Sequence, residues 1–569
     1  MRFCLLLFLS FLLFSASESP KYPTDYFRAP VEHPVLLSGT FGELRSTHFH
    51  AGIDIKSSKG RTGDALVAAA EGYVSRIKVQ AGGYGNALYI KHPNGYTTVY
   101  AHLLEFAPAI ASYVKSKQYE QQSFSVDLFP QAEQFSFQKG ERIGKMGNTG
   151  SSGGPHLHFE IRDSRTEKPI NPLLFGIKVK DTRRPMMNQV RIFGLNHQRE
   201  SIGAKSYDLI ASGKHHKVRG DTIYTPSKEV GVALKTYDQF DGASNWNGVY
   251  QVSMLQEEDL RFRFKMETFS FDERRYINAH LDYEDRVTKK SYFNRCYLLP
   301  GNEMSIYEEV KKEGVVRLQD EASTKITLLS EDIAGNLSKA IFWLKYRPKA
   351  DAPPKKFNYF LPYSDENAID NGQLYVYFPK GSFYENLYLN YQMTLEDSDN
   401  IHSAVHQIHD YRTPVHRSFD IAIRPTKLAA SMKNKAFVAY CDKDGDITNV
   451  GYEWKNERLW AKARTLGDYY IMIDTIPPSI RPNNFSNNMR GKSQMSFKIW
   501  DNFGTGGTAK SLQYQAFVDG QWILMEHDAK TQRIIHRFDE RIGKGEHQLR
   551  IEVSDALGNQ SVLERKFVR

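Results

Sequence analysis

Short runs of alternating apolar and polar residues dominate the chain, and Gly, Asn and Asp separate them. In the first part of the chain, short β-like runs at residues 65–70, 87–91 and 97–102 are separated by Gly-rich turns. Alternation with a period of two is typical of half-buried strands. The 32 Tyr and 34 Phe residues add to this preference, because aromatic side chains favour strands. The pattern therefore predicts a mainly β fold.

One stretch departs from the alternation. Residues 104–137 contain Ala, Gln, Glu and Lys with looser apolar spacing. Such spacing favours a helix over a strand. We expect a helical segment inserted into the first β unit.

At 569 residues the chain is too long for one hydrophobic core, so several domains are expected. Two sequence features recur. Asp-Thr-x-x-Pro occurs at 181–185 and again as Asp-Thr-x-Pro-Pro at 474–478, and Asp-x-x-Gly-Asn occurs at 332–336 and 555–559. The recurrence predicts related β-sandwich (Ig-like) modules, and the segment 350–354, rich in Ala and Pro, reads as a linker. The expected units are a signal peptide (1–17), a first domain (18–176), a β-sandwich with insertions (181–348), a third β-rich module (355–474) and a C-terminal Ig-like sandwich (475–569).

The N-terminus has the features of an export signal. Arg2 precedes an almost wholly apolar run from Phe3 to Phe14, and small residues follow at 15–17. A membrane anchor is the alternative, but the run is shorter than the ~20 residues that span a bilayer. We expect an exported protein of the periplasm or cell envelope, without a transmembrane span once the signal is removed. Outside the signal only Cys296 and Cys441 remain, either as a disulfide or as two separate thiols.

The net charge of +9, with a pI near 9.0, favours anionic envelope polymers as partners. Nucleic acid is not expected, because 66 acidic residues are interleaved with the basic ones and no Lys/Arg-rich arm is present.

Three segments of the first unit supply His and Asp. His50 and Asp54 are four residues apart, His102 follows a strand-like run, and His156 and His158 are two apart. Residues two apart project from the same face of a strand, so His156 and His158 can reach one site. Imidazole and carboxylate are good Zn²⁺ ligands, and three of them leave a fourth position for water. The pKa of a zinc-bound water falls to roughly 7.

Two other interpretations of the same segments lack their required residues. The Gly-rich run 147–154 has no Lys-Ser/Thr ending for a phosphate-binding loop. Ser151 and Ser152 do not lie in a Gly-x-Ser-x-Gly nucleophile elbow.

The ordered combination closely resembles the LytM/lysostaphin-type zinc metallopeptidases. The resemblance lies in His50-Ala-Gly-Ile-Asp54, in Tyr100-Ala-His102-Leu and in Gly-Asn-Thr-Gly followed by Pro-His156-Leu-His158-Phe-Glu. It implies a LytM-type antiparallel β-sheet domain that binds one Zn²⁺ through His50, Asp54 and His158. It also implies that His102 and His156 are catalytic residues that do not bind the metal.

The connection between His102 and the turn at Lys139 is longer than is usual in this family. The insertion is either a wall or lid of the substrate groove, or a surface embellishment.

The remaining histidines are expected to have structural or solvent-exposed roles. His48 is a neighbour of the site and His92 is structural. His402, His406 and His409 have helical spacing, for which a second metal site is the alternative and a solvated helix face is expected. The segment 442–446 resembles a calcium loop but has Ile447 where that loop needs Gly, so a hairpin turn is expected.

The resemblance implies a zinc endopeptidase that cleaves peptide cross-links of bacterial peptidoglycan, at Gly-Gly bridges or D-Ala-to-diaminopimelate bonds, through a metal-activated water. The modules after residue 180 would bind the wall or envelope protein partners, or gate the groove. The alternative function is a wall-associated scaffold or activator whose weakly active peptidase domain recruits partners. A third hypothesis is a peptidase that acts on folded proteins or toxins.

Overall fold

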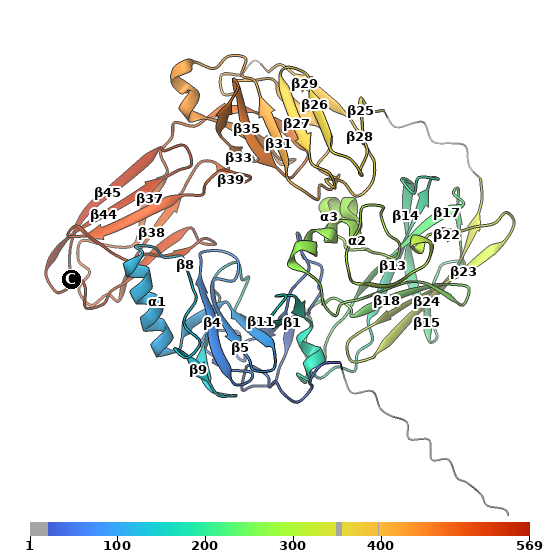
Figure 1. Ribbon diagram of the computed structural model, residues 1–569, viewed down its shortest axis with the longest axis horizontal. Helices are drawn as coiled ribbons and strands as arrows, with labels where there is room; N and C mark the ends of the chain where they lie inside the picture. Colours follow the sequence, from blue (N-terminus) through green and yellow to red (C-terminus); the bar gives the residue numbers. More distant parts are fainter. Residues whose placement is uncertain (1–20, 349–355, 397) are drawn as a thin grey trace, which may run out of the picture.

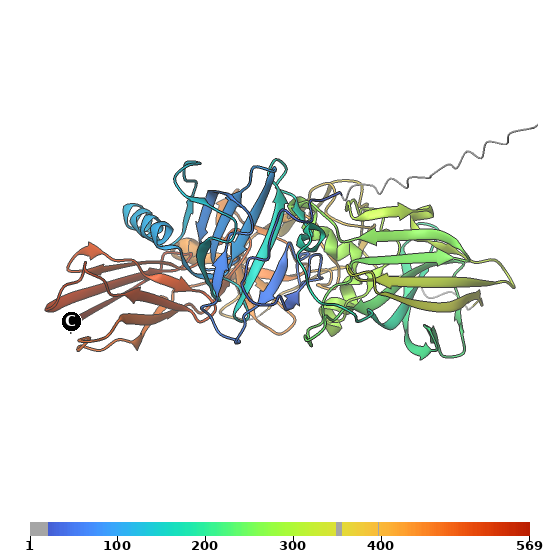
Figure 2. The ribbon, with the colours of Figure 1, turned by 90° about the horizontal axis from the view of Figure 1, so that it is seen from below.

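The computed structural model describes residues 21–348, 356–396 and 398–569, which form four β-rich units arranged in a ring (Figure 1). The fold is mainly β, as predicted. The chain passes from the first unit (21–176) through the second (181–348) and third (356–474) to the fourth (475–569), which returns to the first unit (Figure 1, Figure 2). The expected signal peptide and linker lie outside the described residues.

The first unit is built on a nine-stranded antiparallel sheet. Its main strands lie in the order β1-β2-β11-β6-β5-β4-β8, and a second sheet has the order β3-β10-β7. Apolar side chains of both sheets share one buried core. The elements are β1 (Leu37–Gly39), β2 (Ile53–Lys56), β3 (Ala65–Val67), β4 (Gly72–Val79), β5 (Asn86–Lys91), β6 (Tyr96–Ala101), β7 (Leu103–Phe106), α1 (Pro108–Glu120), β8 (Val126–Leu128), β9 (Ser136–Phe137), β10 (Arg142–Met146), β11 (His156–Asp163), β12 (Pro169–Ile170) and the 3-10 turn η1 (Pro172–Phe175).

The predicted helical insertion contains one helix, α1, and strands on either side of it. Helix α1 begins with Pro108, which suits the first turn because its nitrogen needs no hydrogen-bond partner there. Its buried residues Ile110, Val114 and Gln118 are four apart and so share one face. Strands β8 and β9, which follow α1, pair with β4. The prediction of a helical segment is therefore wrong for this part of the insertion, which extends the main sheet.

In its described residues the second unit contains a twelve-stranded sheet system and four short helical segments. Its elements are β13 (Met186–Leu195), β14 (Ser201–Ser212), β15 (His215–Val218), β16 (Thr222–Thr225), β17 (Glu229–Tyr237), β18 (Gln251–Gln256), β19 (Asp259–Lys265), η2 (Phe271–Tyr276), α2 (Ile277–His280), α3 (Tyr283–Lys289), β20 (Asn294–Arg295), β21 (Tyr307–Val310), η3 (Lys312–Gly314), β22 (Val316–Arg317), β23 (Ser323–Glu331) and β24 (Leu337–Tyr346).

The third and fourth units are each formed by packed sheets around a separate core. The third contains β25 (Tyr359–Leu361), β26 (Asn367–Asp370), β27 (Leu374–Phe378), β28 (Leu387–Leu389), β29 (Tyr391–Thr394), β30 (Val405–Ile408), β31 (Phe419–Ile423), η4 (Ala430–Lys435), β32 (Ala436–Cys441), β33 (Ile447–Gly451), β34 (Glu453–Lys455), β35 (Arg458–Ala463) and β36 (Gly467–Ile473). The fourth contains β37 (Ser479–Asn484), β38 (Gln494–Trp500), β39 (Gly504–Thr505), β40 (Gln513–Val518), β41 (Gln521–Trp522), β42 (Glu526–Asp528), β43 (Arg533–Arg537), β44 (Glu546–Ser554) and β45 (Gln560–Val568).

The predicted helical face at His402, His406 and His409 is wrong. His406 lies in strand β30, between β29 and β36, and is fully buried. Strand pairing overrides the local spacing here, because three residues at helical intervals are too few to specify a helix.

The described residues also include the expected hairpin at 442–446 and both cysteines outside the signal. Strands β32 and β33 form a hairpin across 442–446, as predicted, and Asp442 N donates to Asp446 O at its base. Cys296 and Cys441 are separate free thiols, which resolves the alternative left open by the sequence.

Helix α1 closes the ring by contacting the fourth unit. Lys115 forms an ion pair with Asp539 (2.5 Å), and the rings of Tyr119 and Trp522 meet edge to face with centroids 5.2 Å apart. The insertion is therefore an interdomain contact and not a free surface embellishment. Within the described ranges, no helix is long and apolar enough to cross a membrane.

Candidate metal centre

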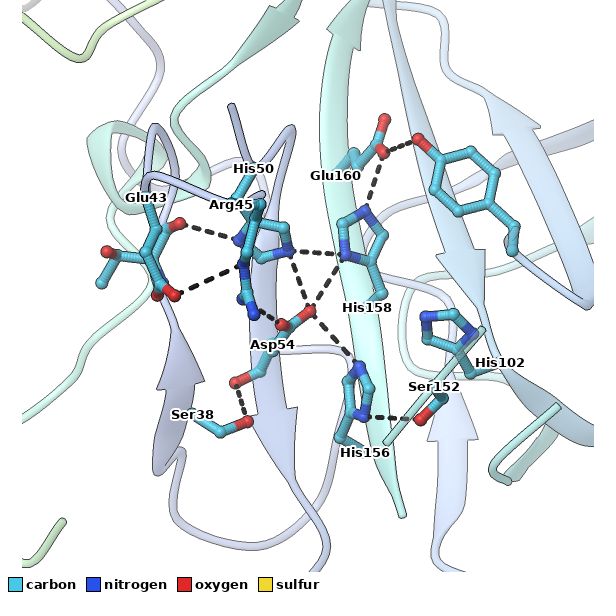
Figure 3. Close-up of polar contacts among 12 residues, drawn as sticks. Ser38, Glu43, Arg45, His50, Asp54, His102, Ser152, His156, His158 and Glu160 are labelled. Atoms are coloured by element: carbon cyan, nitrogen blue, oxygen red, sulfur yellow. Dashed lines mark hydrogen bonds and ion pairs between the residues drawn. The ribbon is translucent and has the colours of Figure 1, made fainter. Parts of the chain in front are cut away.

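Three side chains of the first unit converge on one point (Figure 3). His50 Nε2 and His158 Nδ1 each lie 3.0 Å from Asp54 Oδ1, and the two nitrogens are 2.9 Å apart. Zn²⁺ bonds of about 2.0–2.1 Å in a tetrahedral site place neighbouring ligand atoms about 3.3 Å apart. The spacing and the donor types therefore fit a zinc ion.

Strand pairing positions two members of this cluster. In the antiparallel ladder His158 of β11 lies directly opposite Asp54 of β2, so their side chains share a face. Gly52 allows the preceding loop to pass close to β11, because a Cβ at this position would meet the Phe159 carbonyl oxygen at 2.3 Å. His50 lies outside β2, in the loop that precedes this strand.

The loop that carries His50 is held by the second unit. Phe41, Phe49 and Ala51 belong to the hydrophobic core of that unit and not to the core of their own. The ring centroid of Phe49 lies 5.8 Å from that of Phe269 and 5.6 Å from that of His280. Burial of these side chains therefore positions His50.

Hydrogen bonds assign the tautomers of the two histidines in the cluster. His50 Nδ1–H donates to the Thr40 carbonyl oxygen (2.7 Å), which leaves the Nε2 lone pair facing the cluster. His158 Nε2–H donates to Glu160 Oε1 (2.8 Å), which leaves the Nδ1 lone pair facing it. A histidine that binds a metal commonly donates its other N–H to a carbonyl or carboxylate in this way.

The electrostatics of the cluster favour a bound cation. Burial raises the pKa of Asp54, but His50 and the hydrogen bonds from the neighbouring histidines outweigh this effect and hold the pKa well below its usual range. Arg45 Nη2 binds the second oxygen, Oδ2, at 2.9 Å. Burial lowers the pKa of His158, and its hydrogen bonds to Asp54 and Glu160 raise it to about 9. Without a metal, the two carboxylates therefore favour the protonated, cationic form of His158, and a cation bound at Nδ1 would replace that proton.

Two further histidines, His156 and His102, lie beside the cluster. His156 Nε2 is 3.4 Å from Asp54 Oδ1, and its Nδ1–H donates to the Gly154 carbonyl oxygen (2.8 Å). His102 Nδ1–H donates to the Thr149 carbonyl oxygen (2.8 Å). The two rings are 4.8 Å apart between centroids. Burial, together with the neighbouring histidines, lowers the pKa of His102 to about 3, so it is neutral near pH 7.

The backbone of His102 is in the left-handed region, with φ of 63°. Residues other than Gly adopt this conformation at a cost of order 1–3 kcal/mol, and functional sites are enriched in such residues. The turn after β6 directs the His102 side chain towards His156.

Sequence reasoning assigned no role to the charged residues that follow His158. Glu160 is fully buried and accepts hydrogen bonds from His158, from Tyr84 and from Arg162 Nε (2.6 Å). Because residues two apart share a strand face, the alternation His156, His158, Glu160, Arg162 was a usable signal. No pattern in the sequence indicated that Arg45 would bind the Asp54 carboxylate.

The fourth unit reaches the loop beside these histidines. Lys530 Nζ donates to the carbonyl oxygens of Asn148 (2.5 Å) and Ser152 (3.0 Å). A cavity of about 640 Å³ lies next to this loop, between the insertion and the fourth unit. Its lining includes Thr149, Tyr119, Leu524 and His536.

The histidines expected to be bystanders lie outside the cluster. His48 is exposed, and its Nδ1 contacts the Thr47 hydroxyl (3.1 Å). His92 is buried between the Glu71 carbonyl oxygen (2.6 Å) and the Thr98 hydroxyl (2.7 Å).

Comparison with known proteins identifies the family of the first unit. Residues 48–119 and 130–172 match the model of peptidase family M23, and the interruption falls within the insertion. The first unit is a peptidase family M23 domain. Residues 358–474 of the third unit match the Zu5-like domain.

Relatives of the M23 domain resemble only part of this chain. The DD-carboxypeptidase/endopeptidase Mpg of Neisseria meningitidis is 35% identical over 130 residues, covering 23% of each chain. The murein hydrolase activator NlpD of Escherichia coli is 34% identical over 153 residues, covering 27% of this chain and 32% of NlpD. The chain thus spans about a quarter to a third of the length of these relatives.

Among solved structures, the catalytic domain of a variant of the prophage-encoded M23 protein EnpA from Enterococcus faecalis is similar at 21% identity. It covers 26% of this chain and 98% of that domain, with a TM-score of 0.19.

Proposed function

We propose that this protein is a zinc-dependent endopeptidase that hydrolyses peptide cross-links of bacterial peptidoglycan. The single observation that supports this most strongly is the convergence of His50 Nε2, Asp54 Oδ1 and His158 Nδ1, with the other nitrogen of each histidine already donating to an acceptor. These three residues would hold one Zn²⁺. The bound ion would lower the pKa of a coordinated water and polarise the scissile carbonyl group.

His102 and His156 are proposed to move protons in this reaction. Each donates Nδ1–H to a backbone carbonyl oxygen, which leaves Nε2 for proton transfer. A neutral imidazole near the attacked carbonyl can accept a proton from water. The resulting N–H can stabilise the tetrahedral oxyanion and later protonate the leaving amine.

Peptidoglycan is proposed as the substrate because the similar proteins include a DD-carboxypeptidase/endopeptidase and a murein hydrolase activator. The net charge of +9 would favour attraction to anionic wall polymers. The cavity between the insertion and the fourth unit would form part of the groove, and the chain is proposed to act after export in the periplasm or cell envelope.

Purified sacculi test this function. The exported form of the protein, loaded with Zn²⁺, is expected to release fragments that mass spectrometry identifies as products of cross-link cleavage. His156→Ala should retain zinc and lose cleavage, whereas His158→Ala should lose both. His48→Ala is the matched control and should match wild type.

A second candidate function is a wall-associated activator, favoured by the similarity to NlpD and by the contact of Lys530 with the loop next to His156. In that case the zinc-loaded protein would leave sacculi intact and would stimulate cleavage by a separate murein hydrolase. Intact sacculi in both assays would contradict both functions.

A further inference from the structure

The second and fourth units each bring three aspartates together, far from the His50 cluster in sequence. Within each group, one carboxylate oxygen from each residue lies within 4.8 Å of the other two. Each group begins at the entry to its unit, where the chain arrives from the preceding unit. The first group is Asp181, Asp238 and Asp332, and the second is Asp474, Asp501 and Asp555.

The two groups have the same construction. One aspartate opens the unit in the Asp-Thr motif, and one opens the Asp-x-x-Gly-Asn turn. The third directly follows a strand, within Tyr237-Asp238-Gln-Phe240 after β17 and within Trp500-Asp501-Asn-Phe503 after β38. This aromatic-Asp-amide-Phe repeat was not recognised in the sequence, and it supplies the third carboxylate of each group.

The hydrogen bonds of the two turns are also equivalent. Asn336 N donates to Asp332 Oδ1 (2.9 Å), and its Nδ2 donates to Asp332 Oδ2 (2.9 Å) and the Asp181 carbonyl oxygen (3.5 Å). Asn559 makes the same three bonds to Asp555 and Asp474, at 2.8, 2.7 and 3.0 Å. Each asparagine therefore ties the turn to the entry segment of its unit.

Several oxygens in these groups are buried without a partner. Asp238 is 1% exposed, and its Oδ1 accepts no hydrogen bond. Asp181 and Asp501 are partly exposed, but Asp181 Oδ2 and Asp501 Oδ1 are buried and also accept no hydrogen bond. None of the six carboxylates forms an ion pair with Lys, Arg or His in the described part of the chain. Burying adjacent carboxylates without a counter-charge is unfavourable unless a proton or a cation is bound.

The nearest basic residues do not supply that counter-charge directly. Arg183 donates its guanidinium to Gln239. Lys435 donates to Asn559 Oδ1 (2.6 Å) and to the Leu557 carbonyl oxygen (3.1 Å). Both side chains therefore bind neighbours of the aspartates.

We propose that each group of three aspartates binds one Ca²⁺ ion. The donor set contains only oxygens, which suits a hard cation and not zinc or copper. Calcium–oxygen bonds of about 2.3–2.6 Å allow ligand oxygens to lie up to about 5 Å apart, which matches the spacing within each group.

Each site lies where two units meet. Phe240, two residues after Asp238, is buried in the core of the M23 domain. Phe503, two residues after Asp501, packs on Phe437 of the third unit with ring centroids 5.1 Å apart. A cation on the aspartate would hold this loop and its phenylalanine in place, so the two ions would fix the angles between consecutive units of the ring.

Calorimetric titration of the exported, full-length protein with CaCl₂ tests the proposal, after removal of metals by a chelator. Two Ca²⁺ ions should bind per chain, with Kd values of about 10⁻⁴–10⁻³ M, as in extracellular calcium modules. Asp238→Asn and Asp501→Asn should each abolish one site, and the double variant should abolish both. MgCl₂ should bind more weakly.

Matched controls remove one charge from an exposed carboxylate of the same unit. Asp320→Asn in the second unit and Glu540→Gln in the fourth, whose side chains are 67% and 85% exposed, should leave both sites unchanged. If the Asn variants fail to fold, Tb³⁺ luminescence of the wild-type protein provides a second test, because Trp500 is next to Asp501 and should sensitise the ion. Absence of saturable Ca²⁺ or Tb³⁺ binding, or unchanged Ca²⁺ binding by the folded double variant, would overturn the proposal.

Discussion

Phe49, the residue before His50, packs against Phe269 of the second unit with ring centroids 5.8 Å apart. Both side chains are almost fully buried. The second unit therefore supports the candidate metal site, because it positions His50, one of the three candidate ligands.

We expect Phe269→Leu to weaken zinc binding through the His50 loop. Phe342→Leu is the matched control, since Phe342 is buried in the same core but lies on β24. Each change should lower the free energy of unfolding by about 1–3 kcal/mol. Only Phe269→Leu should also raise the Kd for zinc, as measured by competition with a chelating dye. Equal zinc affinity in the two variants would show that the packing does not position His50.

Glu160→Gln should lower zinc affinity about 10–100-fold, because it weakens the hydrogen bond that orients His158. It should also cost about 3–5 kcal/mol of stability, because it leaves Arg162 buried without its charged partner. Glu167, which lies 3.3 Å from the same arginine but is 55% exposed, provides the control. Glu167→Gln should change both quantities little. Chelator competition and urea unfolding measure the two effects, and similar losses in both variants would contradict the assignment.

The metal-free second unit should become less stable as pH rises from about 4 to about 8. Burial raises the pKa of Asp238 to about 8, and the nearby Asp181 and Asp332 add to this shift, while Arg183 opposes it. The folded state therefore binds a proton that the unfolded state has already released, and the stability this proton provides is lost as pH rises.

Thermal unfolding in a chelating buffer at pH 5 and pH 8 measures this loss. Asp238→Asn should reduce the difference between the two temperatures, and Ca²⁺ should raise the unfolding temperature most at pH 8. An unchanged pH dependence in Asp238→Asn would assign the effect to other groups.

Lys530→Ala should increase the rate of sacculus cleavage a few-fold without changing zinc content. The lysine holds the fourth unit against the carbonyl oxygens of Asn148 and Ser152, beside the proposed groove. Its loss should widen access for a large polymer. Lys544→Ala, an exposed lysine of the same unit, is the control. A slower reaction in Lys530→Ala would mean that the fourth unit supports the groove and does not restrict it.

The sequence by itself determined the features that depend on local periodicity and short motifs. Alternation placed His156 and His158 on one face of β11, and the Asp-x-x-Gly-Asn motifs marked turns that join β23 to β24 and β44 to β45. These features could be predicted because backbone geometry fixes the direction of side chains that are two apart in a strand.

Only the tertiary structure decided which distant residues meet. It placed Phe49 in the core of another unit, Arg45 on Asp54, and Asp238 beside Asp181 and Asp332. It also placed His406 in a buried strand where local spacing had suggested a helix. Such contacts arise from burial and charge pairing between segments far apart in the chain, and a local pattern of residues does not specify its partner.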